Sequence, residues 1–523
     1  MTETLVAVIA LAPVLGAVAA WLAGKRGDAR LAMLVATAGL IAAFAASTAL
    51  AVWTLGAGSR TAFGGLVVVD AFGAYILLLV AAVASVAVAA SPGYLAHGRT
   101  AGTPPPLEEG TYWALLALFA GGLAIVPLVD NLGLVWVGIE ATTVVSAMLV
   151  GFTRSPRAIE AAWKYLILGS IGIGFALLGT MLVFAAAGTS ADSGNALDWT
   201  YLVAHGASLD PGLLRLAFVF ALVGYGTKVG LAPFHTWLPD AHSQAPGPIS
   251  ALLSGAGLAV ALYALARFHL VVVAALGPAF SSTLLVVFGL FSLAVALPFI
   301  VAQGDLKRLL AYSSIEHLGL ATLALGFGGR MALLGFALHL FCHGLAKASA
   351  FVAAGRLVEE AGSHRIARLG GSLARSPAAG RSLLAASLLL SGLPPSGIFV
   401  AELAILFGGV AVGWTMAAAA AAVLLALAMA GLLFHMSRVA AGSSGGHGAR
   451  ATDAEADDVR RAADDATGGV PARGRLPRVA VRTRTALIMA VPLAVVVAAG
   501  LWTPSPMSVA LDQLVAILGG GHG

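Results

Sequence analysis

Long apolar runs fill most of this 523-residue chain, and short polar segments separate them. A helix needs about 20 apolar residues to cross the hydrocarbon core of a bilayer, and runs of this length recur along the sequence. In lipid, a helix satisfies its own backbone hydrogen bonds, so we expect an all-α polytopic membrane protein. The runs predict 14 membrane-spanning helices, near residues 4–24, 31–54, 66–90, 112–129, 131–152, 161–187, 212–232, 247–268, 282–303, 309–327, 331–356, 382–408, 413–437 and 485–502.

The distribution of basic residues gives these spans an orientation. When the loops are numbered in order, the odd-numbered loops carry most of the 29 Lys and Arg. The even-numbered loops carry only Arg60, Arg215, Arg267 and Arg330. Cytoplasmic loops are enriched in Lys and Arg. The pattern therefore predicts a multi-pass protein of the cytoplasmic membrane, with both termini outside.

Composition narrows the classes of protein that remain. Only 10% of the residues are charged and 59% are hydrophobic, whereas a soluble domain carries about 25% charged residues. The net charge of +5 is spread over short loops, which argues against a nucleic-acid partner. The single cysteine, Cys342, allows neither an intrachain disulfide nor a cysteine-ligated cluster. We expect no cofactor, and we interpret the polar segment 441–480 as a flexible cytoplasmic loop.

Ionisable side chains lie inside the predicted spans, where each charge costs several kcal/mol and faces the protein interior or a water-filled cavity. His339, His343 and Lys347 recur every four residues and so form one stripe on a helix. The whole set comprises Glu140, Lys228, His317, His339, His343, Lys347 and Glu402.

Buried ionisable residues can serve as structural ion pairs, as a metal site or in proton transfer. Structural ion pairs would explain one or two buried charges, but not a series over several helices. The spacing of His339 and His343 suits zinc, but Lys347 on the same stripe opposes a metal ion, so we expect no metal. Proton transfer fits best, because burial and nearby charge shift proton affinities by energies similar to the roughly 2.3 kcal/mol needed to move a charge across 100 mV.

Two of these residues lie beside interrupted helices. Lys228 precedes Pro233, and Glu402 follows Pro394 and Pro395. The step from Glu140 to Lys228 is nearly equal to the step from His317 to Glu402, and interrupted helices at matching positions of two halves indicate a transport site. Further candidates near these segments are His235, Asp240, His242, Glu316 and Lys164, of which Lys164 could equally be a solvated anchor at a helix end.

Four segments carry a resemblance to a known family. They read KVGLAPFHTWLPDAHS (228–243), DLKRLLAYSSIEHLG (305–319), HGLAKASAF (343–351) and SGLPPSGIFVAE (391–402). Over about residues 60–440 the chain resembles the antiporter-like subunits of respiratory complex I, multisubunit cation/proton antiporters and membrane-bound hydrogenases. GIEATTVVSAMLVGF (138–152), EAAWKYLILGSIGI (160–173) and SSIEH (313–317) make it most similar to the F component of hydrogenase-4-type complexes.

The resemblance implies a fold and a division of the chain. Three N-terminal helices in 1–111 would precede two inverted five-helix repeats in 112–280 and 281–440. The seventh and twelfth helices would be broken, and 481–523 would hold a final transmembrane helix and a short tail.

The resemblance also implies roles for the buried residues. Glu140 and Lys228 would be a coupled pair, His317 and the stripe on the eleventh span a central relay, and Glu402 the terminal exchange residue. One position departs from the family pattern, because Ala259 stands where many relatives carry a lysine. The relay would cross this point on water or through His242, or it would be interrupted.

The expected function is that of a proton-translocating membrane subunit in a respiratory or hydrogenase-type redox complex. Such a subunit would have no catalytic centre of its own. Its partners would be homologous membrane subunits, a soluble hydrogenase- or dehydrogenase-like arm and the lipid bilayer. The alternatives are a subunit of a sodium/proton antiporter and a non-conducting membrane anchor.

Overall fold

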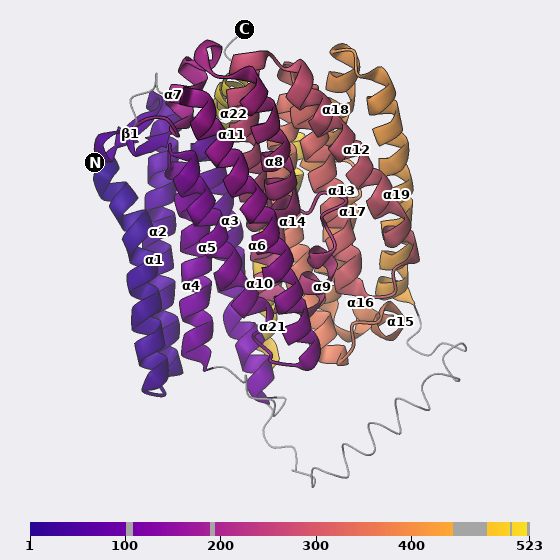
Figure 1. Cartoon of the computed structure of the whole chain (residues 1–523). Helices are drawn as coiled ribbons and strands as arrows, with labels where there is room; N and C mark the ends of the chain where they lie inside the picture. The colour runs from indigo at the N-terminus through magenta and orange to yellow at the C-terminus, as the bar shows by residue number, and fades with distance from the viewer. Residues whose placement is uncertain (101–107, 189–193, 443–477, 503–504, 520–523) are drawn as a thin grey trace.

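The computed structural model describes residues 1–100, 108–188, 194–442, 478–502 and 505–519, and these form a bundle of helices (Figure 1). Twelve helical segments of the described residues are long and apolar enough to cross a membrane. They are α1 (Thr2–Lys25), α2 (Ala29–Ala57), α3 (Ala71–Thr100), α4 (Glu109–Ile125, extended by a 3-10 turn to Leu128), α5 (Leu132–Val150), α6 (Pro156–Ala187), α8 (Pro211–Val229), α10 joined to α11 (Gly247–Leu276), α12 (Ala279–Ala302), α13 (Leu306–Phe327), α14 (Gly329–Ala361) and α19 (Thr415–Ala441).

Shorter helices complete the bundle. Four of them are apolar, namely α17 (Pro377–Leu390), α18 (Gly397–Ala411), Ala486–Leu501 within α21 (Arg478–Leu501) and Ser508–Leu518 within α22 (Ser505–Leu518). The others are α7 (Trp199–Ala204), α9 (Trp237–Gln244), α15 (Ile366–Leu369) and α16 (Ser372–Arg375). The helical membrane fold is thus confirmed, while the total of 14 spans and the inverted repeats stay predictions.

The structure departs from the expected elements in two places. A short antiparallel hairpin, β1 (Arg60–Ala62) with β2 (Val67–Val69), interrupts the otherwise helical chain before α3. The helix predicted to end near residue 268 continues to Leu276, so Arg267 lies inside α11 and not in a loop. Apolar residues resume after Arg267 and His269, so these polar side chains do not end the span.

Both predicted interruptions are present. α8 ends at Val229, and Gly230 has the left-handed backbone (φ 84°) that glycine adopts without strain before the chain turns into α9. α17 and α18 are separated by residues 391–396, in which Gly392 has φ 63°. The Ser396 hydroxyl accepts from the Phe399 amide and so caps the N-terminus of α18.

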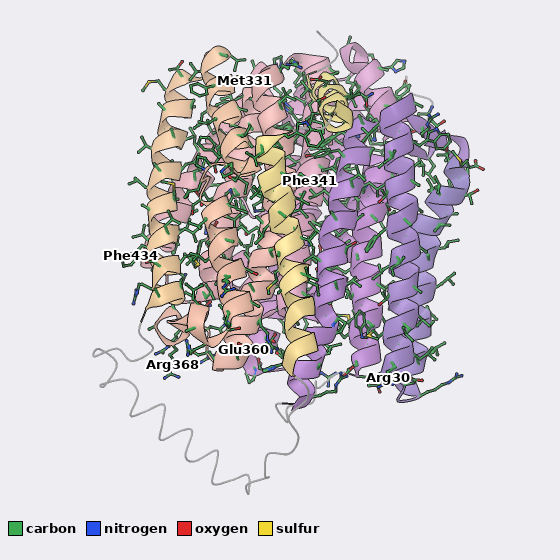
Figure 2. The ribbon with its side chains drawn as sticks, turned by 180° about the vertical axis from the view of Figure 1, so that it is seen from behind. Arg30, Met331, Phe341, Glu360, Arg368 and Phe434 are labelled. Carbon is green, nitrogen blue, oxygen red and sulfur yellow. The ribbon has the colours of Figure 1, made fainter. Side chains whose placement is uncertain are left out.

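The most buried helices lie at the centre of the bundle. Within their most apolar windows, α13 is 94% buried and α14 83% buried, whereas α1 and α19 are each 33% buried. The outer helices present carbon-rich side chains such as Phe434 to the surroundings, and Arg30, Glu360 and Arg368 lie at one end of the bundle (Figure 2). The helix α1 begins toward the opposite end, where α22 lies (Figure 1). This arrangement places α13 and α14, with their ionisable residues, away from lipid.

Candidate functional site

Lys228 occupies the last turn of α8, immediately before the break. Its side chain is 3% exposed. The ammonium donates to the Thr143 hydroxyl at 2.8 Å and to the Tyr165 hydroxyl at 2.5 Å, and it lies 4.7 Å from the centre of the Tyr165 ring. Because Tyr165 accepts from Lys228, its own proton goes to Ser146, 2.7 Å away. The ammonium is therefore solvated by neutral hydroxyls from α5 and α6.

Glu140 lies on α5, one turn from Thr143. One carboxylate oxygen accepts from the Ser170 hydroxyl at 2.6 Å, and the other has no hydrogen-bond partner among the described residues. No ion pair joins Glu140 to Lys228 in the described structure. The two groups predicted to form a coupled pair are close enough for their charges to interact, but each is hydrogen-bonded to different hydroxyl-bearing side chains.

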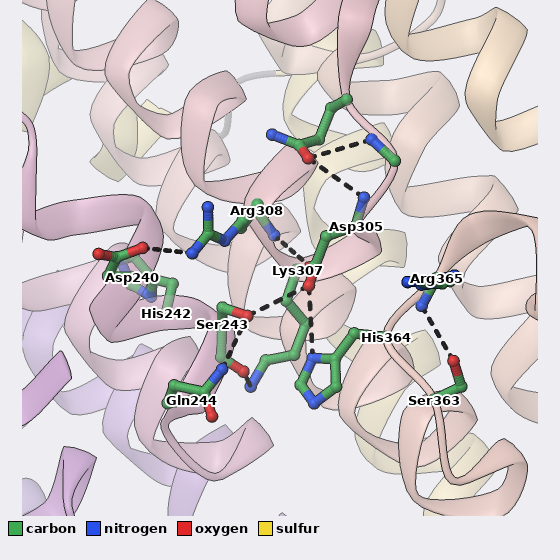
Figure 3. A network of polar contacts seen from close by, with 12 residues as sticks. Asp240, His242, Ser243, Gln244, Asp305, Lys307, Arg308, Ser363, His364 and Arg365 are labelled. Atoms are coloured by element: carbon green, nitrogen blue, oxygen red, sulfur yellow. Dashed lines mark hydrogen bonds and ion pairs between the residues drawn. The ribbon is translucent and has the colours of Figure 1, made fainter. Parts of the chain in front are cut away.

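Ion pairs hold α9 against the neighbouring helices α6 and α13. Asp240 forms ion pairs with Lys164 of α6 at 3.2 Å and with Arg308 of α13 at 2.5 Å. Lys164 also pairs with Glu160 at 2.5 Å. Figure 3 shows Arg308 reaching across to Asp240. These pairs are partly exposed, so each contributes little stability by itself, but together they connect the two halves of the chain through one carboxylate.

A second set of contacts holds the end of α9. The Lys307 ammonium is buried and donates to the backbone carbonyls of Ser243 and Ala245, where the helix leaves carbonyls without partners (Figure 3). Asp305 accepts from the Ser243 hydroxyl at 3.3 Å and lies 3.7 Å from the His364 ring. Burial, reinforced by the charge of Lys307, lowers the pKa of His364.

Two of the candidate histidines come from the break and from α9. His235 is 8% exposed and lies among the rings of Phe299 and Tyr312. His242 is fully buried, and neither ring nitrogen has a hydrogen-bond partner among the described residues. Its ring stacks on Phe351 at 4.8 Å, one turn beyond Lys347 on α14. His242 therefore reaches the helix that carries the predicted relay.

Two serine hydroxyls lie near the start of α11, the helix that carries Ala259. Ala259 is 2% exposed and follows a π-helical segment, Leu253–Gly257. Within that segment the Ser254 hydroxyl lies 2.9 Å from the Ser314 hydroxyl of α13. Ser254 of this pair thus lies five residues before the gap at Ala259, on the same continuous helical segment.

The predicted stripe on α14 is confirmed as a buried set, and α13 completes it. His317 Nδ1 lies 3.2 Å from His339 Nε2, and the His317 and His343 rings are 5.2 Å apart. Lys347 is fully buried and donates to the Leu310 carbonyl at 2.8 Å. The three imidazoles and the ammonium are therefore contiguous along the α13–α14 contact.

Glu402 of α18 reaches this cluster from the second broken helix. One of its oxygens lies within 4.8 Å of ligand atoms of His317 and His339. The carboxylate packs against the backbone of Gly392, where any added Cβ would collide with it. Glu316, 6% exposed on α13, is close enough to Lys347 and Glu402 for their charges to interact. Two carboxylates thus accompany the three histidines and the lysine.

Sequence reasoning missed the hydroxyls that contact the buried charges. Thr143 could have been found from its position one turn after Glu140. Tyr165 and Ser170 gave no comparable signal, because a lone polar side chain in an apolar run is common. Arg267 was misplaced in a loop, and its partner Asp70, which binds it at 2.6 and 2.8 Å, was not considered.

Comparison with known proteins shows the family. Residues 129–428 match the model of the NADH:quinone oxidoreductase/Mrp antiporter transmembrane family. This segment is more than half of the chain, and the chain therefore belongs to that family. It is an antiporter-like membrane subunit of the kind found in complex I, Mrp and membrane-bound hydrogenase-type complexes, as the sequence motifs predicted.

Individual relatives agree with this assignment. The chain is 39% identical over 388 residues to a hydrogenase-4 component F homolog of Methylacidiphilum infernorum, covering 73% of this chain and 80% of the relative. It is 34% identical over 331 residues to NADH-quinone oxidoreductase subunit N of Desulforudis audaxviator, covering 63% of each.

Two solved structures share the fold. A chain of the Mrp complex from a Dietzia species has a TM-score of 0.82 at 21% identity, covering 99% of this chain and 97% of that one, a likeness that shows the fold alone. A chain of respiratory complex I from Thermus thermophilus has a TM-score of 0.69 at 25% identity, covering 96% and 98%.

Proposed function

We propose that this chain moves protons across the cytoplasmic membrane as a subunit of a respiratory or hydrogenase-type redox complex, with both termini outside. The observation that carries the proposal is the environment of Lys228. Its ammonium is buried, contacts two neutral hydroxyls and has no carboxylate within ion-pair distance among the described residues. A buried charge without a counter-charge is costly, so release of its proton relieves a large free-energy cost at this point.

The remaining ionisable residues supply a sequence of proton-transfer groups across the bundle. We infer that protons exchange between Glu140 and Lys228 through the hydroxyls that contact them, and then pass to Lys347. The segment around Ala259 would be crossed by His242, by the Ser254–Ser314 pair or by water. From Lys347 and Glu316 the path continues through the histidine cluster to Glu402, which serves as the exchange residue at the far end.

The two terminal carboxylates support homologous membrane subunits as partners. Glu140 and Glu402 are half-buried, and each lies on a helix with exposed apolar side chains next to it, such as Val137 at 50% and Leu403 at 37%. A carboxylate at this depth is unfavourable against lipid. We infer that another subunit covers each of these faces and connects its own ionisable residues to this row.

The relatives favour a redox partner as the source of energy. The hydrogenase-4 component F homolog and the subunit N of NADH-quinone oxidoreductase are both named for redox complexes. We therefore propose a soluble hydrogenase- or dehydrogenase-like arm whose electron transfer shifts the charge states here. Asp240, which connects α6, α9 and α13, is the site where such a shift would reach both halves of the chain.

The test is replacement of Lys228 by alanine in the assembled complex. Proton translocation into inverted membrane vesicles should be lost, while the amount of assembled complex is unchanged. The matched control is Lys25→Ala, which removes a lysine that is 52% exposed and lies at the end of α1. Unchanged translocation by the Lys228→Ala complex would contradict the proposal.

Two other outcomes separate the alternatives. Proton exchange that requires sodium and persists without electron transfer would favour an antiporter subunit. If the variant with both Glu140→Gln and Glu402→Gln still translocates protons at the full rate during electron transfer, a non-conducting anchor is favoured. Both results are measured in the same vesicles with a pH-sensitive dye.

A further inference from the structure

Three helices bring two imidazoles and a carboxylate to one point inside the bundle. His317 comes from α13, His339 from α14 and Glu402 from α18, and one ligand atom of each lies within 4.8 Å of the other two. All three are side chains that bind transition-metal ions in proteins. The proposed function uses these groups for protons, and a site that binds protons at two nitrogens and one oxygen also presents lone pairs to a cation.

The separation of the two imidazole nitrogens matches that in a tetrahedral zinc site. Zinc–nitrogen bonds are about 2.0–2.1 Å long, so two ligand nitrogens of a tetrahedral site lie roughly 3.3–3.4 Å apart. His317 Nδ1 and His339 Nε2 are 3.2 Å apart. In the metal-free protein a hydrogen bond explains this distance, with one proton between the two nitrogens. A zinc ion that replaces this proton needs almost no change in the nitrogen–nitrogen distance.

The other ring nitrogens impose no competing orientation. His317 Nε2 and His339 Nδ1 are buried and have no hydrogen-bond partner among the described residues. No geometric hydrogen bond therefore fixes either ring on its far side, although the Leu390 backbone lies close to the His317 ring. Glu402 likewise accepts no hydrogen bond from the described residues. Its carboxylate oxygen already lies within 4.8 Å of the two imidazole nitrogens, so a short movement brings it into the coordination sphere.

The charge around the proposed ligands is less positive than the α14 residues His339, His343 and Lys347 alone indicate. Lys347, two turns from His339, would repel a metal ion, which is why the sequence argued against one. The fold adds the Glu316 carboxylate beside that ammonium, and the Glu402 carboxylate lies close enough to Glu316 for their charges to interact. One carboxylate compensates the lysine, and the second is a ligand for the ion.

We propose that His317, His339 and Glu402 form a binding site for zinc or a similar divalent transition-metal ion, and that the bound ion blocks proton transfer between the histidine cluster and Glu402. Three protein ligands leave a fourth position for water, as in zinc sites that are not purely structural. The binding site follows from the geometry alone, whereas the block rests on the proposed function.

Binding is measured directly on the purified full-length chain in detergent. Zinc is titrated by calorimetry, and cobalt(II) replaces it as a probe whose visible absorption distinguishes tetrahedral from octahedral coordination. Loss of an outer-shell partner alone weakens metal binding about 10- to 100-fold. We therefore expect His339→Gln and Glu402→Gln each to weaken zinc binding at least tenfold and to remove the tetrahedral cobalt spectrum.

The control is His435→Gln. This buried histidine lies on α19 and bonds the Val301 carbonyl of α12 at 2.9 Å, so its ring contacts none of the three proposed ligands. Zinc affinity in this variant should equal that of the unaltered chain. Equal affinity in the unaltered chain, His339→Gln and Glu402→Gln would overturn the site, and having variants on two different helices covers the case in which one of them does not fold.

The block is tested separately in vesicles that contain the complex. Micromolar zinc should slow proton translocation, and a chelator should restore it. Zinc that binds at the site without slowing translocation would overturn the block. The Lys228→Ala result does not depend on zinc, so failure of the metal site and failure of the proposed function are distinguishable.

Discussion

Replacing Asp70 by asparagine should destabilise the protein strongly, because it leaves a buried arginine without its counter-charge. Arg267 is fully buried, and its guanidinium donates to both oxygens of Asp70 at 2.8 and 2.6 Å. It also lies 3.8 Å from the centre of the Trp199 ring and 4.8 Å from that of Tyr263. The carboxylate is the one formal negative charge that bonds it within the described structure.

The magnitude follows from these contacts. Removing one partner of a buried ion pair costs about 3–5 kcal/mol, because the remaining charge stays in a low-dielectric site. Contacts with the aromatic rings persist, and each retains about 0.5–2 kcal/mol of attraction. Asp70 also accepts from the Gly73 amide at 2.8 Å at the start of α3, a cap that asparagine can replace. Asp70→Asn therefore removes the charge and leaves the cap.

The measurement is a double-mutant cycle. Free energies of unfolding come from titration of the purified chain with SDS, followed by circular dichroism for the whole fold and by tryptophan fluorescence, to which Trp199 contributes. Asp70→Asn and Arg267→Met should each cost about 3–5 kcal/mol, and the double variant should cost clearly less than their sum. Arg60→Met is the control, because Arg60 contacts Trp53 at 4.1 Å near the surface, and its loss should cost about 1 kcal/mol or less.

Two results would refute this reasoning. A loss below about 1 kcal/mol in both single variants would mean that water reaches Arg267 and that the site is not dry. A double variant as unstable as the sum of the two single variants would mean that the two side chains stabilise the fold independently.

Two further predictions concern the proposed proton path. Tyr165→Phe removes a hydroxyl that accepts from Lys228, and loss of a hydrogen bond to a charged group, about 1.5–3 kcal/mol, should slow translocation about tenfold or more without loss of assembly. An unchanged rate would show that the hydroxyl is not needed. Gly392→Ala should slow translocation as strongly as Glu402→Gln, because the added Cβ displaces the carboxylate, whereas Gly413→Ala adds a Cβ in open space at a similar positive φ and should only reduce stability. Equal rates for the two glycine variants would contradict this positioning role.

The sequence was sufficient to predict the membrane helices and the ionisable row because both depend on local pattern. Apolar length predicts a span, and a charge inside such a run is rare enough to be noticed at Glu140, Lys228 or Glu402. The prolines beside Lys228 and Glu402 likewise predicted the two interruptions, since proline cannot continue the backbone hydrogen bonding of a helix.

Contacts between distant segments could not be predicted in the same way. Arg267 and Asp70 are 197 positions apart, and nothing local shows that the arginine has a carboxylate inside the bundle. The same limit applies to Tyr165. Its hydroxyl becomes important only because α6 brings it to the last turn of α8, where it accepts from Lys228 in place of a carboxylate.

Ala259 stands where many relatives carry a lysine, and the fold brings other polar side chains to the helices that carry the ionisable row. Along α11 the absence of a lysine is an interruption, because no other Lys, His, Asp or Glu is within a turn of that position. In three dimensions, the helix that carries Lys347 is approached by His242 from α9, through its stacking on Phe351. The Leu310 carbonyl that binds the Lys347 ammonium also accepts from the Ser314 hydroxyl at 3.0 Å. These contacts support our proposal that side chains of α9 and α13 offer a route past Ala259, in which α11 need not carry a charge.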